Sequence, residues 1–353
     1  MDFTFTDDQH RFRESVRTFL DGECTPDRLR ALWETESGRS QELWLALAEM
    51  GILGLTVPET HGGLGLDEID LVLVLEEIGR AALAAPVLET VAVGVPLLAE
   101  TGSNDLAERW LPAVASGLAI LTVGLAATRF VGDAHVADLL LLEHDGELHA
   151  VPRADVTLAR EPANDPAARL FRVDWHPSPA TRIAAGADAR RLLDAALDRA
   201  SLAAAAELLG IAQRLIDLAA RYAGQREQFG RPIGSFQAVK HMLASVQVQT
   251  EFARPVVYRA AWTVARGTDP AARAVAVSHA KAAASEAAVQ AAKTALQVHG
   301  AIGYTWEVDL HVWMKRAWAL DVAWGTRLWH RARVGRAILD ADAPAPSFGF
   351  SAT

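Results

Sequence analysis

Apolar residues recur at helical spacing through the first 118 residues of the chain. The apolar positions between Phe12 and Leu20 lie on one helical stripe, and Thr6–Gln9 has the sequence of a capping box that would start this helix. Further helices are predicted over residues 41–50, from Asp67 or Asp70 to about residue 85, and over residues 104–111. We therefore expect residues 1–118 to form an N-terminal helical domain.

The pattern changes at Ala119 to short apolar runs separated by turn signals. Asp145-Gly146 is a strong turn signal between two of these runs. The predicted strands cover residues 120–124, 138–143, 149–151, 156–158 and 170–173. Residues 119–185 are therefore expected to form a small, reduced middle β domain.

Long helical patterns return from about Ala187 onward. The first predicted helix would end at Gly224 as a C′ glycine, and the second would be capped by Ser235 and kinked at Pro255. The third predicted helix would start at Asp269-Pro270 and reach His299. The last predicted helix would cover Leu310 to Asp340. Long amphipathic helices with short loops predict an antiparallel four-helix bundle over residues 186–353. The predicted fold class is mostly α.

Composition narrows the classes of function. The 353 residues are 51% hydrophobic, with a net charge of −10, which argues against a nucleic-acid or anionic-membrane surface. Cys24 is the single cysteine, so no intramolecular disulfide can form. The first residues lack the pattern of a signal peptide, and no uncharged apolar run is long enough to span a bilayer. We expect a cytoplasmic protein, with no membrane or nucleic-acid partner and no metal site.

Two short segments between the long helices carry the most informative residues. The first is Arg226-Glu-Gln-Phe-Gly, followed by Phe236-Gln237, and the second is Gln297-Val-His-Gly-Ala-Ile-Gly-Tyr304. With the loop 57–66 and the order of helical, β and helical regions, they resemble the acyl-CoA dehydrogenase family. The resemblance spans nearly the whole chain but is weak across residues 119–185.

In that family an FAD lies between two subunits, and the resemblance implies roles for these segments in a shared FAD site. Arg226 would pair with the pyrophosphate, since a guanidinium suits bidentate contacts. The other implied cofactor-binding residues are Gln228 at the phosphates or ribityl chain, Phe229 beside the cofactor, Phe236 and Gln237 at the adenine side, and Gln297, Gly300 and Ala301 at the phosphates and adenosine. Taken singly, Arg226 suits a solvated loop, the phenylalanines suit core or interface positions, and Gly300 suits a helix cap; their joint order favours the flavin surface.

The family's catalytic base has no counterpart here. Members use a carboxylate to remove the substrate's α-proton while the flavin takes a hydride from the β-carbon. Its usual Glu-Gly-Thr motif corresponds to Trp324-Gly325-Thr326, and the alternative position in the first bundle helix falls near Ala200, followed by Ser201. No catalytic residue is therefore predicted, although Asp198 and Asp321 are the nearest carboxylates by sequence.

Other residues of the family's active site are also missing. After Ala126-Ala-Thr128 we find neither the T-E-P-x-x-G-S-D stretch nor the W-I-T segment, and Leu328 stands in place of a flavin-contacting glutamine. The tryptophans of the last helical region are interpreted as core and interface residues: Trp313, Trp318, Trp324 and Trp329. The side of the site that this subunit would own is thus reduced, whereas the side that it lends to a neighbour persists.

Three functions remain open. The leading hypothesis is a non-catalytic subunit of an α2β2 acyl-CoA dehydrogenase, resembling those that handle bulky CoA thioesters in bacterial steroid catabolism. It would lend flavin contacts to a homologous catalytic subunit that oxidises an acyl-CoA substrate and reduces an electron-transfer flavoprotein. The alternatives are a flavin-free structural or acyl-CoA-binding homologue, and a self-sufficient dehydrogenase in which Asp198 or Asp321 is a displaced base.

Overall fold

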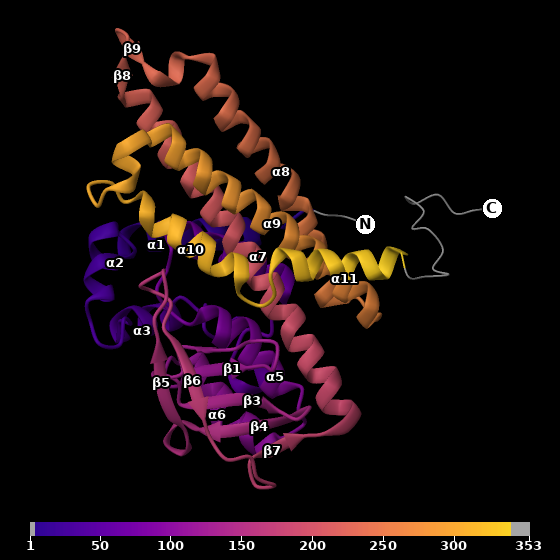
Figure 1. Ribbon diagram of the computed structural model, residues 1–353. Coiled ribbons are helices and arrows are strands. Elements are labelled where there is room, and N and C mark those ends of the chain that lie inside the picture. Colours follow the sequence, from indigo (N-terminus) through magenta and orange to yellow (C-terminus); the bar gives the residue numbers. More distant parts are fainter. Residues whose placement is uncertain (1–3, 340–353) are drawn as a thin grey trace, which may run out of the picture.

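The computed structural model describes residues 4–339, which form a helical N-terminal region, a small β region and a long helical bundle (Figure 1). The N-terminal helices are α1 (Asp7–Glu23), α2 (Pro26–Trp33), α3 (Gln41–Glu49), α4 (Glu68–Ala81), α5 (Val95–Ala99) and α6 (Asn104–Ala115), with a π-helical segment over Leu88–Gly94 before α5. The predicted mostly α fold is confirmed. Among the described residues, no helix combines the length and apolar character needed to cross a bilayer.

Local capping signals place the N-terminal helices correctly. Thr6 and Gln9 form both bonds of the capping box at the start of α1, and Asp67 caps α4 in the same way. The prediction missed α2, which begins after Thr25 with Pro26 at its first position.

The β region contains two small sheets that lie below the bundle in Figure 1. The first has the order β1 (Leu121–Gly124), β3 (Leu139–His144), β4 (Glu147–Pro152) and β7 (Arg182–Ala184), and the second has the order β2 (Val131–Gly132), β6 (Leu170–Asp174) and β5 (Thr157–Glu161). β1 and β3 are parallel and the other pairs are antiparallel. The predicted strands are present, whereas the short strands β2 and β7 were missed.

The bundle comprises α7 (Gly186–Gln225), α8 (Gln237–Arg266), α9 (Pro270–His299), α10 (Leu310–Val322) and α11 (Arg327–Leu339). Asp269 caps α9 as predicted, and α8 ends at Gly267. The prediction for Gly224 is wrong, because α7 continues through it to Gln225. Ser235 does not cap α8 either, since its hydroxyl donates to the Pro232 carbonyl and Phe236 occupies the N-cap position. α8 continues through Pro255.

The last predicted helix is two helices, broken at Trp324-Gly325, where both residues have positive φ. The break is stabilised from two neighbouring helices. The buried Lys281 Nζ donates to the Leu320 and Asp321 carbonyls at 2.8 and 3.1 Å, and the Ser201 hydroxyl donates to the Trp324 carbonyl at 3.1 Å. These bonds satisfy carbonyls that lose their helical partners at the end of α10. The predicted end at Asp340 lies outside the described residues.

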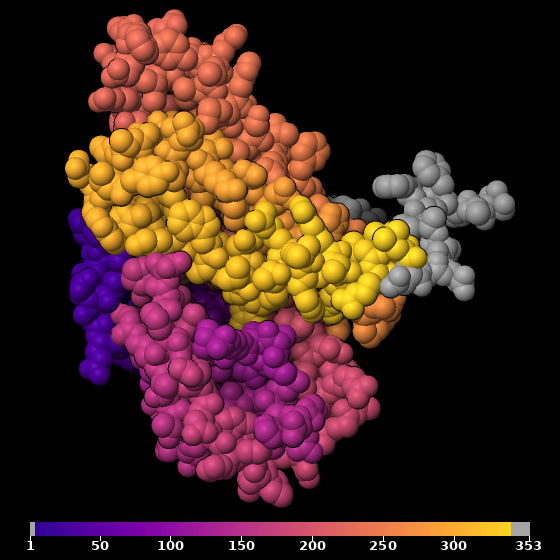
Figure 2. Space-filling view, in the orientation of Figure 1, coloured from indigo at the N-terminus to yellow at the C-terminus, as the bar shows by residue number. Residues whose placement is uncertain are grey.

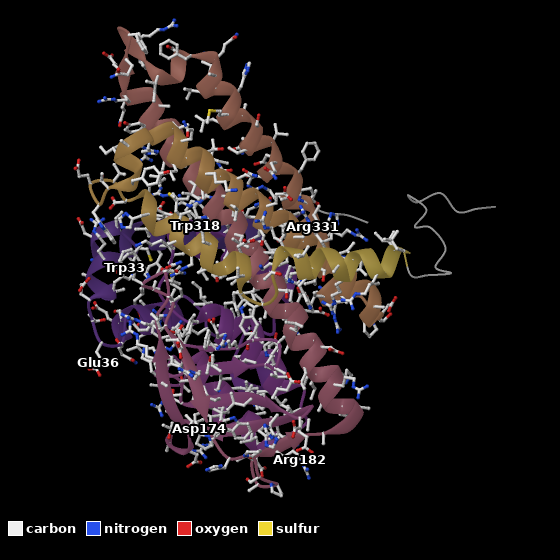
Figure 3. All side chains as sticks on the ribbon, viewed as in Figure 1. Trp33, Glu36, Asp174, Arg182, Trp318 and Arg331 are labelled. Atoms are coloured by element: carbon white, nitrogen blue, oxygen red, sulfur yellow. The ribbon has the colours of Figure 1, made fainter. Side chains whose placement is uncertain are left out.

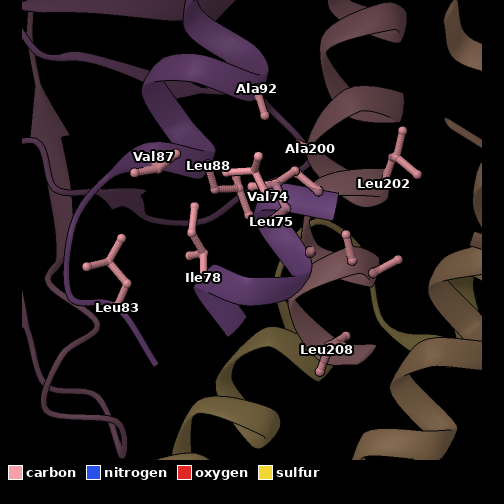
Figure 4. Packing of buried hydrophobic residues seen from close by; sticks show 14 of the residues in the cluster. Val74, Leu75, Ile78, Leu83, Val87, Leu88, Ala92, Ala200, Leu202 and Leu208 are labelled. Carbon is pink, nitrogen blue, oxygen red and sulfur yellow. The ribbon is translucent and has the colours of Figure 1, made fainter. Parts of the chain in front are cut away.

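The main core joins α4, the π-helical segment and α7 (Figure 4). Leu75 and Ile78 pack there with Leu88 and Leu208. Glycine permits the close approach of α4 to α7, because a Cβ on Gly79 would lie 2.0 Å from the Glu207 carbonyl oxygen. This packing fixes the position of Glu207.

Candidate functional site

The residues predicted to contact a flavin gather at one end of the bundle. We call this end the bundle tip, consisting of residues 226–237 and 297–301. The end of α7 passes into a hairpin of β8 (Glu227–Gln228) and β9 (Arg231–Pro232), which projects at the top of Figure 1, and α8 starts beside it. The Tyr222 and His299 rings stack with centroids 4.3 Å apart, which joins the ends of α7 and α9. Two segments about seventy residues apart in the sequence thus form one surface.

The polar groups of the bundle tip face outward. Arg226, Gln228 and Gln297 are exposed, and within residues 4–339 their side chains form no hydrogen bond or ion pair. Gln237, Gly300 and Ala301 are exposed as well. The backbone holds Arg226 in place, because its N–H donates to the Tyr222 carbonyl and its own carbonyl accepts from Ile233, both at 2.8 Å. The guanidinium is therefore fixed at its base and free at its end.

The aromatic residues of the tip form a small exposed cluster. Phe229 sits at the hairpin turn with φ of 54° and is 91% exposed. Its ring meets Phe236 edge-to-face with centroids 6.1 Å apart, and the Arg231 guanidinium lies 4.2 Å from the Phe236 ring centre. A ring this exposed is typical of an interface.

Gly300 adds an open stretch of backbone. Its φ of 66° and ψ of −143° favour glycine, and a Cβ there would meet no atom within 4 Å. A free guanidinium, free amides, exposed rings and open backbone fit the phosphates and adenosine of a dinucleotide presented from outside the chain.

A second feature lies on the other side of α10. A cleft of about 730 Å³ opens between the β region and the C-terminal helices, where Figure 2 shows a hollow between the magenta and yellow parts. Its walls come from segments 83–89, 127–133 and 163–170, from α7, and from the α10–α11 segment. No residue predicted to contact the flavin lines it.

Tryptophan side chains form one wall of the cleft. Trp318, labelled in Figure 3, and Trp329 are partly exposed there, and Trp324 is buried at the helix break. Trp313 instead lies in the core, and its Nε1 donates to the Arg80 carbonyl at 2.8 Å. The core interpretation thus holds for Trp313 and Trp324, whereas Trp318 and Trp329 are exposed beside an open cleft.

Most charges in the cleft are bonded within the chain. Arg316 donates to Asp165 Oδ2 at 2.5 Å and to the Leu83 carbonyl at 3.0 Å. Arg39 pairs with Asp133, and Arg169 donates to two backbone carbonyls at 2.9 and 3.0 Å. The guanidinium groups of these arginines therefore connect the segments that form the walls of the cleft.

Two carboxyl groups that line the cleft, those of Glu207 and Glu89, have raised pKa values. Glu207 is only 5% exposed, lines the cleft, and has no hydrogen bond or ion pair among the described residues. Burial raises the pKa of Glu207 to about 8. Burial and the nearby Asp133 raise the pKa of Glu89, which also lines the cleft, to about 7. Sequence reasoning missed Glu207, although an acid directly after the alanine run 203–206 was an available signal.

The carboxylates considered as displaced bases lie elsewhere. Asp198 is buried and accepts from Arg273 at 2.9 Å and from Arg333 at 2.8 Å, and Asp321 pairs with Arg327 at 3.0 Å. Neither lines the cleft. Ala200 is buried in the core beside Ser201, whose hydroxyl donates to the Trp324 carbonyl, so the two positions predicted to match the family's base meet here without a carboxylate.

Comparisons with known proteins cover most of the chain. Residues 6–118 match the family described as acyl-CoA dehydrogenase, N-terminal domain, and residues 181–339 match acyl-CoA dehydrogenase, C-terminal domain. The chain is 34% identical to "Acyl-CoA dehydrogenase IpdE2" of Mycolicibacterium smegmatis, over 88% of this chain and 93% of that protein.

Solved structures are also similar to this chain over nearly its whole length. The ChsE4-ChsE5 complex from Mycobacterium tuberculosis matches with a TM-score of 0.87 and 30% identity, over 97% of this chain and 100% of that chain. The Tcur3481-Tcur3483 steroid ACAD matches with a TM-score of 0.85 and 26% identity, over 96% of this chain and 99% of that chain. Both structures contain a pair of differently named proteins.

Proposed function

This chain belongs to the acyl-CoA dehydrogenase family of oxidoreductases that act on CH–CH bonds, and we propose that it is the non-catalytic subunit of a heteromeric member. In this proposal it lends cofactor contacts from its bundle tip to a homologous catalytic subunit. That subunit supplies the base, and the assembly is an α2β2 tetramer.

The separation of the bundle tip from the cleft is the observation that carries the proposal. The tip residues proposed to bind the cofactor are exposed, except for the half-buried Phe236, and none of them lines the chain's own cleft. A dinucleotide bound by Arg226 and Gly300 must therefore be completed by groups of another chain. Isologous pairing of two like bundles provides such an arrangement.

The tip residues fit an FAD held in this way. Arg226 would bind the diphosphate, Gln228 and Gln297 would bind polar groups of the phosphate and ribityl region, and Phe229, Phe236 and Gln237 would pack around the adenine side. Gly300 and Ala301 would bring open backbone to the phosphates. A bound flavin would supply the hydride acceptor, and the tip residues would bind and orient that flavin.

The positions matched to the family's base support a non-catalytic role. The Trp324 indole cannot take a proton from a substrate carbon, and Ala200 has no ionisable group. Asp198 and Asp321 are held by arginines outside the cleft, which weighs against the self-sufficient alternative.

The relatives guide the remaining parts of the proposal. The named pairs in the ChsE4-ChsE5 complex and the steroid ACAD favour a homologous second subunit and a bulky, steroid-derived acyl-CoA substrate. An electron-transfer flavoprotein is the proposed electron acceptor.

The test is flavin content and turnover of this chain purified alone and co-expressed with a homologue that carries an intact Glu-Gly-Thr motif. We expect little flavin and no acyl-CoA oxidation in the lone chain, and about one FAD per pair of subunits in the complex. Full flavin content with turnover in the lone chain would contradict the proposal.

A further inference from the structure

The cleft raises a separate question, because a chain that only lends contacts outward does not need an open chamber of its own. Its tryptophan wall could have closed the space, yet about 730 Å³ remains open. The cavity is also not uniformly apolar, since Glu207 from α7 reaches it. An apolar core residue at this position would pack against α4 at no desolvation cost.

Glu207 is the key group. The residue is only 5% exposed, it lines the cleft, and it lacks a hydrogen-bond or ion-pair partner among residues 4–339. Burying a carboxyl costs free energy relative to an apolar side chain, so its position at the cleft needs a reason. A ligand that completes its hydrogen bonds supplies that reason.

The groups around Glu207 define the chemistry of the ligand. Arg316 on α10, Asp165 on segment 163–170 and Glu89 in the π-helical segment are the charged groups that act on it, and α4 meets it with the backbone contact at Gly79. Arg316 is already bonded to Asp165 and the Leu83 carbonyl. No free cation in this group is available for an anionic ligand, and Arg316 disfavours a cationic one.

Much of the rest of the wall is apolar, although the exposed Arg129 and Asn164 also line it. Trp318, Trp324, Leu88 and Leu197 line the cleft together with several alanines. Such walls suit a molecule that is mostly hydrocarbon, and one carboxyl at their base suits a single oxygen atom on it.

We propose that the cleft binds a neutral, largely apolar molecule with a hydroxyl or ketone oxygen, and that the Glu207 carboxyl hydrogen-bonds this oxygen. At neutral pH the raised pKa keeps Glu207 protonated, so it can donate to a ketone as well as accept from a hydroxyl. This site belongs to the chain itself and does not depend on the proposed heteromer.

The experiment uses the full chain and two probes of matched shape, 2-decalone and decalin, with binding followed by the fluorescence of the tryptophans in the wall. We expect wild type to prefer the ketone by roughly threefold to tenfold, as one neutral hydrogen bond allows. Glu207→Leu should abolish this preference and bind decalin at least as tightly as wild type does. Glu207→Gln, which keeps a donor, should retain the preference. Glu108→Leu, at an exposed acid on α6, is the matched control and should also retain it.

A pH series separates direct binding from a packing effect. Wild-type affinity for 2-decalone should fall as the pH rises from 6.5 to 9, because Glu207 loses its proton near pH 8, whereas Glu207→Gln should show no such fall. The proposal is wrong if folded wild type binds neither probe saturably, binds both equally, or if Glu207→Leu keeps the preference for the ketone.

Discussion

The bundle tip and the cleft treat their polar groups in opposite ways. At the tip, Arg226 and Gln228 are anchored by backbone but have free side chains in solvent. In the cleft, Arg316 and Arg39 are bonded within the chain, and Glu207 is left buried and unpaired. Unpaired exposed groups at the tip can bind a molecule presented from outside the chain, whereas an unpaired buried group in the cleft can bind a molecule that enters the cleft. The two regions therefore indicate two different tasks.

The largest expected effect comes from Asp198, which belongs to neither region. Asp198→Asn leaves Arg273 and Arg333 facing each other without a carboxylate, so we expect a loss of about 3 kcal/mol in unfolding free energy. Asp194→Asn, at an exposed site one turn earlier, should change stability little. Chemical denaturation measures both. If Asp198 were a base, the assembled enzyme would instead lose turnover without losing stability.

The next effect tests whether Glu207 is buried in the protonated form. The unfolded state loses this proton near pH 4.5 and the folded state near pH 8, so wild-type stability falls as the pH rises through this window. Glu207→Gln lacks this titration. Its stability relative to wild type should rise from pH 5 to pH 8, by about 3 kcal/mol. Glu108→Gln should show no such trend in the same unfolding series; an equal trend in both would show that the cleft does not bury Glu207.

Arg226 tests the bundle tip directly. In the complex with a catalytic homologue, Arg226→Ala should weaken FAD binding about tenfold, since a charge-assisted hydrogen bond is lost. Arg190→Ala removes the same charge from an exposed site near the other end of α7 and should leave FAD affinity unchanged. Titration of the flavin-depleted complex gives both constants. Equal affinities in the two variants would argue for a flavin-free role.

The smallest effects compare two exposed glycines near the tip. Gly300 has positive φ, so Gly300→Ala should cost about 1 kcal/mol even though its Cβ has room. Gly224 lies inside α7 with open space around it, so Gly224→Ala should stabilise the chain by about 0.5–1 kcal/mol. Thermal unfolding should show shifts of opposite sign; a loss at Gly224 would contradict the continuous helix.

Local signals in the sequence predicted local structure well. Thr6 and Asp269 marked helix starts because a capping side chain acts within three residues. Gly224 was misjudged because the helical bonds continue past it, to the Arg226 N–H that donates to the Tyr222 carbonyl. The break at Trp324-Gly325 was misjudged because tertiary contacts decide it: Lys281 and Ser201 supply bonds to the broken turn from other helices.

The bundle tip was likewise predicted from local motifs, whereas the cleft, which depends on contacts between distant segments, was not. The order of motifs predicted the bundle tip, and the structure gathers those residues on one surface. Their roles stay a prediction, as does the division into domains at residues 118 and 185. Glu207 was missed because its surroundings come from loops far away in the sequence, near residues 130 and 165. Helical periodicity predicts on which face of a helix a residue lies, but it does not predict whether that face borders a cavity.

The structure of the complex with its catalytic homologue and FAD tests the central claim most directly. We predict that the Arg226 guanidinium lies about 3 Å from the diphosphate of an FAD whose ring is held by the other subunit. An FAD held wholly within this chain's own cleft, with Arg226 in solvent, would contradict the claim.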